Sequence, residues 1–158
     1  MLLLTYPLRN GIIIQGESSS PKRKKERMTA MSISFNRDSV FNLKPIGLEE
    51  IIGDFKGLLV NGEQPVLAFK TVRDQLVFTN MRIVSIDVQG LTGKRKSFTS
   101  MPYSKVQFFT IQTPAFAEIF SDSELYLVFS DGTTATFEFS GGADIGYIGR
   151  MISGYVLR

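Results

Sequence analysis

The chain has 158 residues, of which 43% are hydrophobic, and a formal net charge of +3. This length fits one domain with a tail, and the hydrophobic fraction is sufficient for a packed core. The sequence contains no cysteine, which excludes disulfides, thiolate metal sites and a cysteine nucleophile. It contains no histidine either, the side chain on which acid–base catalysis and metal ligation depend most. We therefore expect a protein that is not an enzyme, has no catalytic residues and needs no metal or other cofactor.

The positive charge is concentrated near the N-terminus. Residues 1–27 carry six basic and two acidic side chains, whereas the rest of the chain carries 12 basic and 13 acidic ones. The body of the protein is therefore close to neutral. Because nucleic-acid binding generally needs a broad basic face, no nucleic-acid partner is expected.

Residues 1–30 are predicted to be a disordered basic tail, followed by a linker over residues 31–44. The two apolar runs of the tail are interrupted at residues 7–10 and its charge comes last, which is unlike a signal peptide. Neither run approaches the length of about 20 residues needed to span a bilayer, so we expect a cytoplasmic protein. The run PKRKKER is a solvated tail or an arm for acidic lipid or nucleic acid. Because this run can be encoded by purine-only codons, as a ribosome-binding site would be, we hypothesise that translation starts naturally at Met28 or Met31.

The first element expected in a domain over residues 45–158 is a short N-terminal helix. Apolar residues recur there at three- and four-residue spacing, and Pro45 with Glu49 and Glu50 suits a helix start. Gly53 and Gly57 weaken this helix, so it must depend on tertiary packing.

From residue 66 the apolar period changes to two, which is typical of strands. Seven short runs rich in β-branched and aromatic residues are separated by Gly, Asp, Asn, Ser and Pro. They cover residues 66–73, 75–79, 82–88, 96–101, 106–112, 124–130 and 134–140. Parallel crossovers need a dozen or more residues, so these runs predict an antiparallel meander that forms a barrel or two packed sheets.

The chain then ends in an amphipathic helix. After Gly141 and Gly142, an apolar stripe at helical spacing runs to the end of the chain. Its members are Ile145, Ile148, Met151, Ile152, Tyr155 and Val156. We expect this helix to cap an open end or seam of the sheet.

Seven antiparallel strands followed by one helix resemble the pleckstrin-homology-like (PH-like) plan, which is mainly β. The segments RDQLVFTNMRIV (73–84), DVQGLTGKRKSFTSMPYSKV (87–106), DSELYL (122–127) and FEFSGG (137–142) are similar to the bacterial PH-domain family. The resemblance extends from Ile46 to Leu157. It implies a small, cytoplasmic, non-catalytic domain, and some members of the family form ring-like homo-oligomers. Eukaryotic PH domains often bind phosphoinositides through a basic loop between their first two strands. Here that turn lies around Asp74 and Gln75, so this role does not transfer.

The segment QGLTGKRKS (89–97) raises the question of a phosphate-binding loop. A P-loop needs four residues between its glycines, a Ser or Thr after the lysine, and a helix behind it. Only two residues separate Gly90 from Gly93, and a strand is expected to follow, so the glycines are predicted to shape a hairpin turn. Lys94, Arg95 and Lys96 are either an anion-binding patch for lipid headgroups or a charged hairpin tip that discourages edge pairing.

The segment FFTIQTPAFAEIF (108–120) has more bulky apolar residues than one buried face needs. Phe108, Phe109, Phe116, Ile119 and Phe120 are covered by the helix or a loop, or they form an interface with a second copy or an unidentified protein partner.

Other candidate sites are weak. Asp122 and Glu124 flank Ser123 and are expected to shape a turn, and Tyr103 is expected to pack at a strand junction. The sequence therefore predicts a binding or scaffold domain that acts through protein–protein interaction and homo-oligomerisation. The alternative is a peripheral binder of anionic membrane surfaces through residues 94–96.

Overall fold

The computed structural model describes residues 42–113, 122–140 and 142–157. The predicted tail over residues 1–30, and most of the linker after it, lie outside the described residues. The strands are β1 (Lys44–Ile46), β2 (Pro65–Lys70), β3 (Gln75–Thr79), β4 (Arg82–Gln89), β5 (Arg95–Pro102), β6 (Val106–Gln112), β7 (Ser123–Phe129) and β8 (Thr134–Phe139). The helices within the described ranges are three 3-10 helices, η2 (Leu48–Glu50), η3 (Gly53–Leu58) and η4 (Tyr103–Lys105), and one α-helix, α1 (Ile145–Val156).

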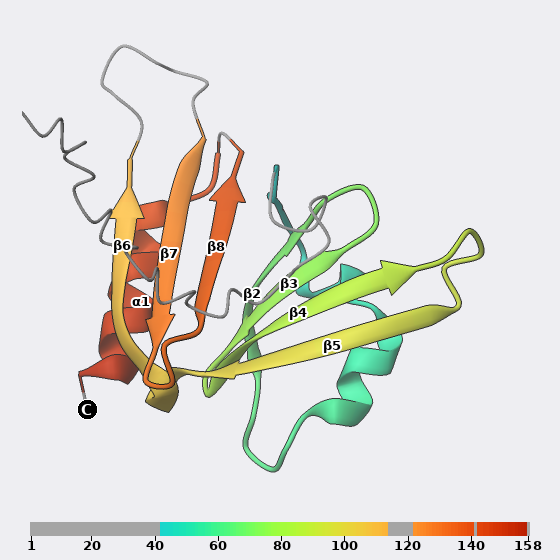
Figure 1. The fold of residues 1–158 in the computed structure, drawn as a ribbon. Coiled ribbons are helices and arrows are strands. Elements are labelled where there is room, and N and C mark those ends of the chain that lie inside the picture. Colours follow the sequence, from blue (N-terminus) through green and yellow to red (C-terminus); the bar gives the residue numbers. More distant parts are fainter. Residues whose placement is uncertain (1–41, 114–121, 141, 158) are drawn as a thin grey trace, which may run out of the picture.

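The strands form two antiparallel sheets, with the order β1-β2-β3-β4-β5 in one and β6-β7-β8 in the other (Figure 1). All seven predicted runs are strands, and the two-sheet alternative is confirmed over a closed barrel. Leu43 forms an isolated parallel bridge with Phe139, which joins the start of the first sheet to β8. At the other corner, the edge strands β5 and β6 are connected only through η4. Among the described strands, the outer edges of β5 and β6 pair with no further strand, and we call these two edges the open seam.

The main core lies between the two sheets and α1. It combines apolar side chains from the inner faces of both sheets with three isoleucines of the helix. Its fully buried members include Leu76, Phe78, Ile83, Leu125, Leu127, Phe137, Phe139, Ile148 and Ile152. Removing this apolar area from water supplies the main driving force for the fold.

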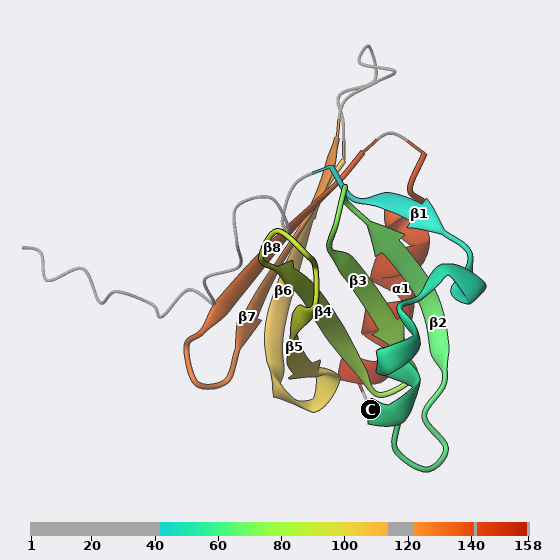
Figure 2. The ribbon, with the colours of Figure 1, turned by 90° about the vertical axis from the view of Figure 1, so that its right-hand side faces the viewer.

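α1 packs across the β6 side of this core, as the apolar stripe predicted. Asp144 caps the helix by accepting a hydrogen bond from the Tyr147 amide at 2.8 Å. Gly149 lies so close to Ile111 of β6 that an added Cβ would be 2.3 Å from its Cδ1 atom. Tyr155 stacks on Tyr103 of η4 at a ring-centroid distance of 4.8 Å. Figure 2 shows α1 behind the first sheet, with β1 and β2 at one side.

A second core lies on the outer face of the first sheet. Ile51 and Phe55 pack there against apolar side chains of β2, β3 and β4. This cover explains why β3 is buried on both faces. The Gln75 side chain fixes the cover in place, because it accepts from the Ile52 amide at 2.9 Å and donates to the Glu50 carbonyl at 3.0 Å.

The predicted N-terminal helix differs in form from the observed segment. A short strand, β1, comes first and includes Pro45, and two 3-10 turns replace a continuous α-helix. Gly53 and Gly57 lower helix propensity, and Ile51 and Phe55 are the side chains of this segment that are buried against the sheet. The predicted apolar stripe therefore includes the two buried side chains of this segment, Ile51 and Phe55, but it also includes Leu48, which is 43% exposed, and it does not give the backbone conformation.

Candidate functional site

The β4–β5 hairpin ends in the glycine-containing turn that the sequence indicated. Gln89 is the last residue of β4 and pairs with Arg95 of β5. Gly90 and Gly93 have positive φ angles of 76° and 63°, and the Gly93 amide donates to the Gly90 carbonyl at 3.2 Å. These conformations favour glycine because it has no Cβ. A strand follows this turn, so the prediction that the glycines shape a hairpin is confirmed.

The three predicted cations of this hairpin have different surroundings. Lys94 and Arg95 are exposed at the tip, whereas Lys96 is partly buried. The Lys96 Nζ atom lies 2.5 Å from Oδ2 of Asp54 on η3. Lys96 thus links the hairpin to η3, and because it is already paired with Asp54 it offers less charge to a ligand than Lys94 and Arg95 do.

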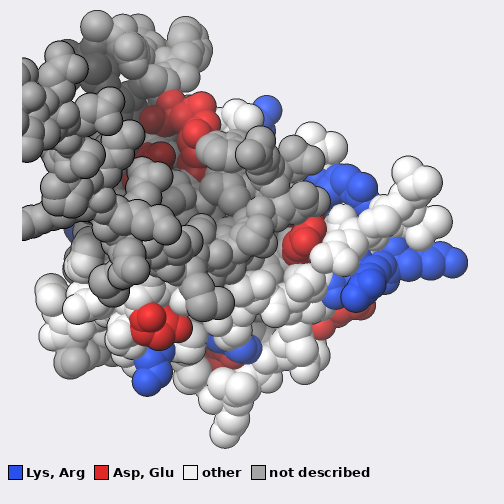
Figure 3. All heavy atoms as spheres, viewed as in Figure 1, with Lys and Arg blue, Asp and Glu red and all other residues white. Residues whose placement is uncertain are grey.

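A fourth cation joins the tip from the β2–β3 turn. Arg73 donates a hydrogen bond from its guanidinium to the Gly90 carbonyl. The two turns are further connected by Asp74, whose Oδ1 accepts from the Val88 amide at 2.7 Å. Figure 3 shows Lys and Arg side chains gathered at the projecting end of the β4–β5 hairpin. Sequence reasoning missed Arg73, because only the register of β2, β3 and β4 places it there.

The predicted apolar interface is only partly described. Phe108 pairs with Val128 and is 52% exposed on the outer face of the second sheet. Phe109 pairs with Leu127, points to the inner face and packs against the main core. The remaining predicted residues, Phe116, Ile119 and Phe120, lie outside the described residues.

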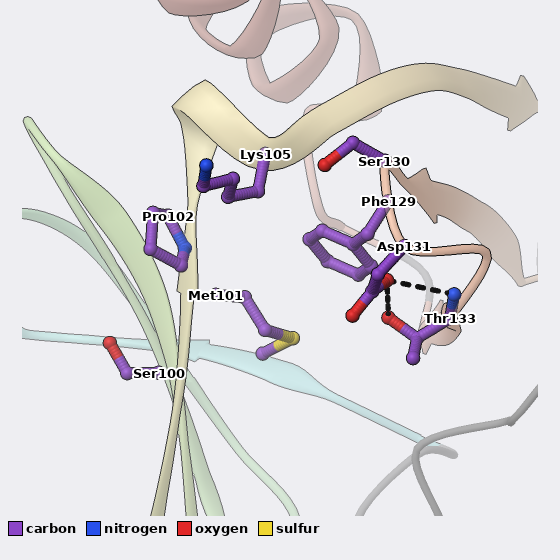
Figure 4. A pocket seen from close by; sticks show the side chains of 8 residues that line it. All are labelled: Ser100, Met101, Pro102, Lys105, Phe129, Ser130, Asp131 and Thr133. Carbon is purple, nitrogen blue, oxygen red and sulfur yellow. Dashed lines mark hydrogen bonds between the residues drawn. The ribbon is translucent and has the colours of Figure 1, made fainter.

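A hollow of about 420 Å³ lies where β5 ends, beside the β7–β8 turn (Figure 4). Its lining combines two core side chains with hydroxyl groups and one charge of each sign. The lining residues are Ser100, Met101, Pro102, Lys105, Phe129, Ser130, Asp131 and Thr133. Hydrogen bonds from the backbone amide and then the hydroxyl of Thr133 lower the pKa of Asp131. The hollow lies close to the open seam, since Pro102 ends β5.

A buried ion pair fixes the opposite end of the β4–β5 hairpin. The Arg82 guanidinium donates to both carboxylate oxygens of Glu63, at 2.8 and 2.9 Å. It also donates to the Leu58 carbonyl at 2.7 Å and to Ser100 Oγ at 2.9 Å. Burial alone would raise the pKa of Glu63, but hydrogen bonds from Arg82, the Val60 amide and Thr79 together lower it.

The carboxylates near the start of β7 do not resemble a metal centre. Glu124 pairs directly with Glu138 across β7 and β8. Burial, followed by the hydrogen bond and charge of Asp122 and the charge of Glu124, raises the pKa of Glu138. Within the described ranges, no three Asp, Glu, His or Cys side chains form a group that suits a metal ion.

Tyr103 is a packing residue, as predicted. It is buried, and its hydroxyl donates to the Thr79 carbonyl at 2.9 Å. Burial, with a smaller contribution from Tyr155, raises the pKa of Tyr103, so its hydroxyl remains protonated. Among the helices that the structure describes, none is long and apolar enough to cross a bilayer.

Two antiparallel sheets with a C-terminal helix across one end define a PH-like domain. Two solved structures carry the same fold at appreciable sequence identity. A DUF1696 family protein with a pleckstrin-homology domain from Shewanella loihica is 32% identical, with a TM-score of 0.63 over 73% of this chain and 98% of that one. A pleckstrin homology domain from Shewanella amazonensis is 33% identical, with a TM-score of 0.56 over 72% and 90%.

The chain belongs to the bacterial PH-domain family, since residues 34–156 match the sequence model of that family. A third structure is a PH-domain-containing protein from Exiguobacterium sibiricum, which is 15% identical with a TM-score of 0.52. The match covers 73% of this chain and 61% of that one, and at this identity it shows the fold alone. The uncharacterized protein YjqA of Bacillus subtilis is 37% identical over 70 residues. That match covers 44% of this chain and 56% of YjqA.

Proposed function

We propose that this chain is a non-catalytic binding and scaffold domain that acts through protein–protein interaction and assembles with copies of itself. The observation that supports the proposal best is Phe108 on the edge strand β6. An aromatic ring that is 52% exposed on a sheet face is the kind of side chain that protein interfaces bury. Unpaired strand edges next to it add backbone groups that a second copy can pair with.

The geometry favours a contact at the open seam. Phe108 follows the 3-10 turn that connects β5 to β6, so the exposed ring and both strand edges belong to one region. The hollow at the end of β5 adds a concave surface there. A stable contact between two copies would need to bury about 800 Å² on each partner. Family members that form ring-like homo-oligomers make a closed ring the form of assembly to test first.

The test is the molar mass of the full chain in solution, measured by light scattering during size-exclusion chromatography. We expect an oligomer for the natural sequence and a shift toward monomer for Phe108→Ser. Val60→Ser is the matched control. Val60 is about as exposed as Phe108, at 56%, but it lies just after η3, which packs on the first sheet and not on the second. A strict monomer at micromolar concentration contradicts self-association. If the Phe108→Ser variant has the same oligomeric mass as the natural sequence, Phe108 is not part of the contact.

A second candidate function is peripheral contact with anionic membrane surfaces through residues 94–96. The supporting observation is that Lys94 and Arg95 are exposed together at a projecting turn. Each Lys or Arg near such a surface contributes about 1 kcal/mol, so two or three of them give only weak attachment. Vesicle co-sedimentation with a Lys94/Arg95/Lys96→Ala variant tests this function. Unchanged binding by the variant would show that residues 94–96 do not bind the membrane.

A further inference from the structure

The two turns that contain Arg73, Lys94 and Arg95 also carry two aliphatic side chains that are almost fully exposed to solvent. Val72 in the β2–β3 turn and Leu91 in the β4–β5 turn have 99% and 105% of their reference areas exposed. They are the two most exposed large hydrophobic side chains among the described residues. Because both belong to tight turns, neither contributes to the core or to a sheet face.

Hydrogen bonds connect the two turns that carry these side chains. The Arg73 guanidinium bonds to the Gly90 carbonyl, so the residue after Val72 is tied to the residue before Leu91. The Asp74 carboxylate on the Val88 amide fixes the same two turns from beneath. The two turns that carry Val72 and Leu91 are therefore held to each other by the fold, although they belong to separate hairpins.

Exposed cations belong to the same two turns. Arg73, Lys94 and Arg95 lie within a few residues of Val72 or Leu91, and Lys96 is drawn away by Asp54. The carboxylates of Asp74 and Asp87 keep their negative charge but are less exposed than these cations, since Asp74 is 5% exposed and Oδ1 of Asp87 is buried. Asp74 bonds to an amide, and Asp87 Oδ2 accepts from Gln89 Nε2 at 3.1 Å. The tip therefore presents positive charge beside exposed aliphatic surface.

An anionic bilayer surface matches both properties at once. Aliphatic side chains gain by entering the boundary between headgroups and acyl chains, and Lys and Arg gain by remaining with the lipid phosphates. A nucleic acid would use the cations but would leave Val72 and Leu91 in water. A flat protein partner gives no reason for the most exposed aliphatic groups to lie at the ends of projecting turns.

We propose that the docking tip, formed by Val72, Arg73, Leu91, Lys94 and Arg95, binds anionic membranes by inserting Val72 and Leu91 into the interface. This inference rests on the second candidate function, which is a purely electrostatic contact through residues 94–96. It adds the β2–β3 turn to the contact surface, and it adds insertion of aliphatic side chains into the membrane interface. Neither Lys94 nor Arg95 lines the hollow at the end of β5. Total headgroup charge, rather than headgroup shape, should therefore decide binding.

Co-sedimentation of the full chain with vesicles tests the proposal. Phosphatidylcholine vesicles are compared with vesicles that also contain phosphatidylglycerol or phosphatidylserine at equal charge. We expect the two anionic compositions to bind alike and phosphatidylcholine alone to bind little. Val72→Ser with Leu91→Ser should weaken partitioning by roughly tenfold or more, because apolar burial is lost while every charge is kept. Leu157→Ser, at an 83% exposed site after α1, is the matched control and should bind as the natural sequence does.

A labelling experiment reads insertion directly. The chain has no cysteine, so Leu91→Cys accepts one environment-sensitive fluorophore, and Leu157→Cys provides the control position. Anionic vesicles should shift the emission to shorter wavelength at residue 91 and leave it unchanged at residue 157. Equal spectra at residue 91 with and without vesicles, in a sample that sediments with them, would overturn insertion.

The outcomes separate this inference from the function on which it rests. Full binding by the Val72→Ser/Leu91→Ser variant overturns insertion but leaves the electrostatic contact standing. Absence of vesicle binding by the natural sequence overturns both. Binding to a single-stranded oligonucleotide without binding to any vesicle assigns the cations to nucleic acid and also overturns the proposal.

Discussion

Replacing Arg82 by methionine should destabilise the domain strongly. The Glu63 side chain is completely buried, and the Arg82 side chain retains 21% exposure. In Arg82→Met, the carboxylate keeps its hydrogen bonds from the Val60 amide and the Thr79 hydroxyl but loses both guanidinium donors. The Leu58 carbonyl and the Ser100 hydroxyl lose the same partner. The result is a buried charge without its counter-ion.

The expected cost follows from the burial of this pair. Removing one partner of a buried ion pair costs about 3–5 kcal/mol, whereas an exposed pair contributes about 0–1 kcal/mol. Lys70→Met is the matched control, because Lys70 and Glu50 form an ion pair at 2.6 Å with both side chains almost half exposed. The free energy of unfolding of a domain of this size is about 5–15 kcal/mol, so Arg82→Met should remove a large fraction of it.

Urea unfolding at two pH values measures the free energy of unfolding. In the natural sequence the pKa of Glu63 is lowered, so its contribution to stability is present above the ordinary value of 4.5 and is lost as the pH falls through the folded-state pKa. Without Arg82, burial raises the pKa of Glu63 instead. The difference between Arg82→Met and the natural sequence should therefore be large near about pH 7 and smaller near about pH 4. A loss no greater than that of Lys70→Met, or a difference independent of pH, would refute this reasoning.

Two smaller predictions concern the contacts of α1 and η4. Gly149→Ala should gain less stability than the roughly 1 kcal/mol that alanine normally adds inside a helix, because its Cβ would be 2.3 Å from Ile111 Cδ1 and the end of that side chain must move, and the full gain should appear when the same change is made in Ile111→Val. Thermal denaturation checks both variants, and a Gly149→Ala protein that shows the full gain without Ile111→Val would contradict the predicted clash. Tyr103→Phe should cost about 1–3 kcal/mol in urea unfolding, since the Thr79 carbonyl loses its buried donor. Because the pKa of Tyr103 is raised, the stability linked to its protonated form is complete below the ordinary value of 10.0 and is lost as the pH rises above it.

The strands and the C-terminal helix were predictable because their signals are local. Alternating apolar residues mark β2 to β8, and an apolar stripe at helical spacing marks α1. The N-terminal segment was predicted less well. Its apolar spacing identifies Ile51 and Phe55 as buried, but that spacing does not distinguish an α-helix from two 3-10 turns laid on a sheet.

The candidate site depends on contacts that sequence spacing does not contain. Lys96 and Asp54 are 42 positions apart, so the ion pair that divides the three cations depends on how η3 covers the sheet. Val72 lies in a run that was predicted to be strand up to residue 73, whereas β2 ends at Lys70 and the turn begins directly after it. Strand boundaries are weakly specified by an apolar pattern, and here the boundary decides whether Val72 faces the core or projects into water.

The two proposed surfaces are compatible, because β5 separates them. The strand begins at Arg95 in the docking tip and ends at Pro102, next to the open seam that contains Phe108. A ring formed through the seam would leave every docking tip uncovered and would present several of them together. Weak contacts multiply when they are linked, because the later ones become intramolecular. Phe108→Ser should therefore weaken vesicle binding even though it leaves the tip unchanged, whereas Val72→Ser/Leu91→Ser should weaken vesicle binding without changing the molar mass in solution. If Phe108→Ser yields monomers that bind vesicles as well as the natural chain does, assembly contributes nothing to membrane attachment.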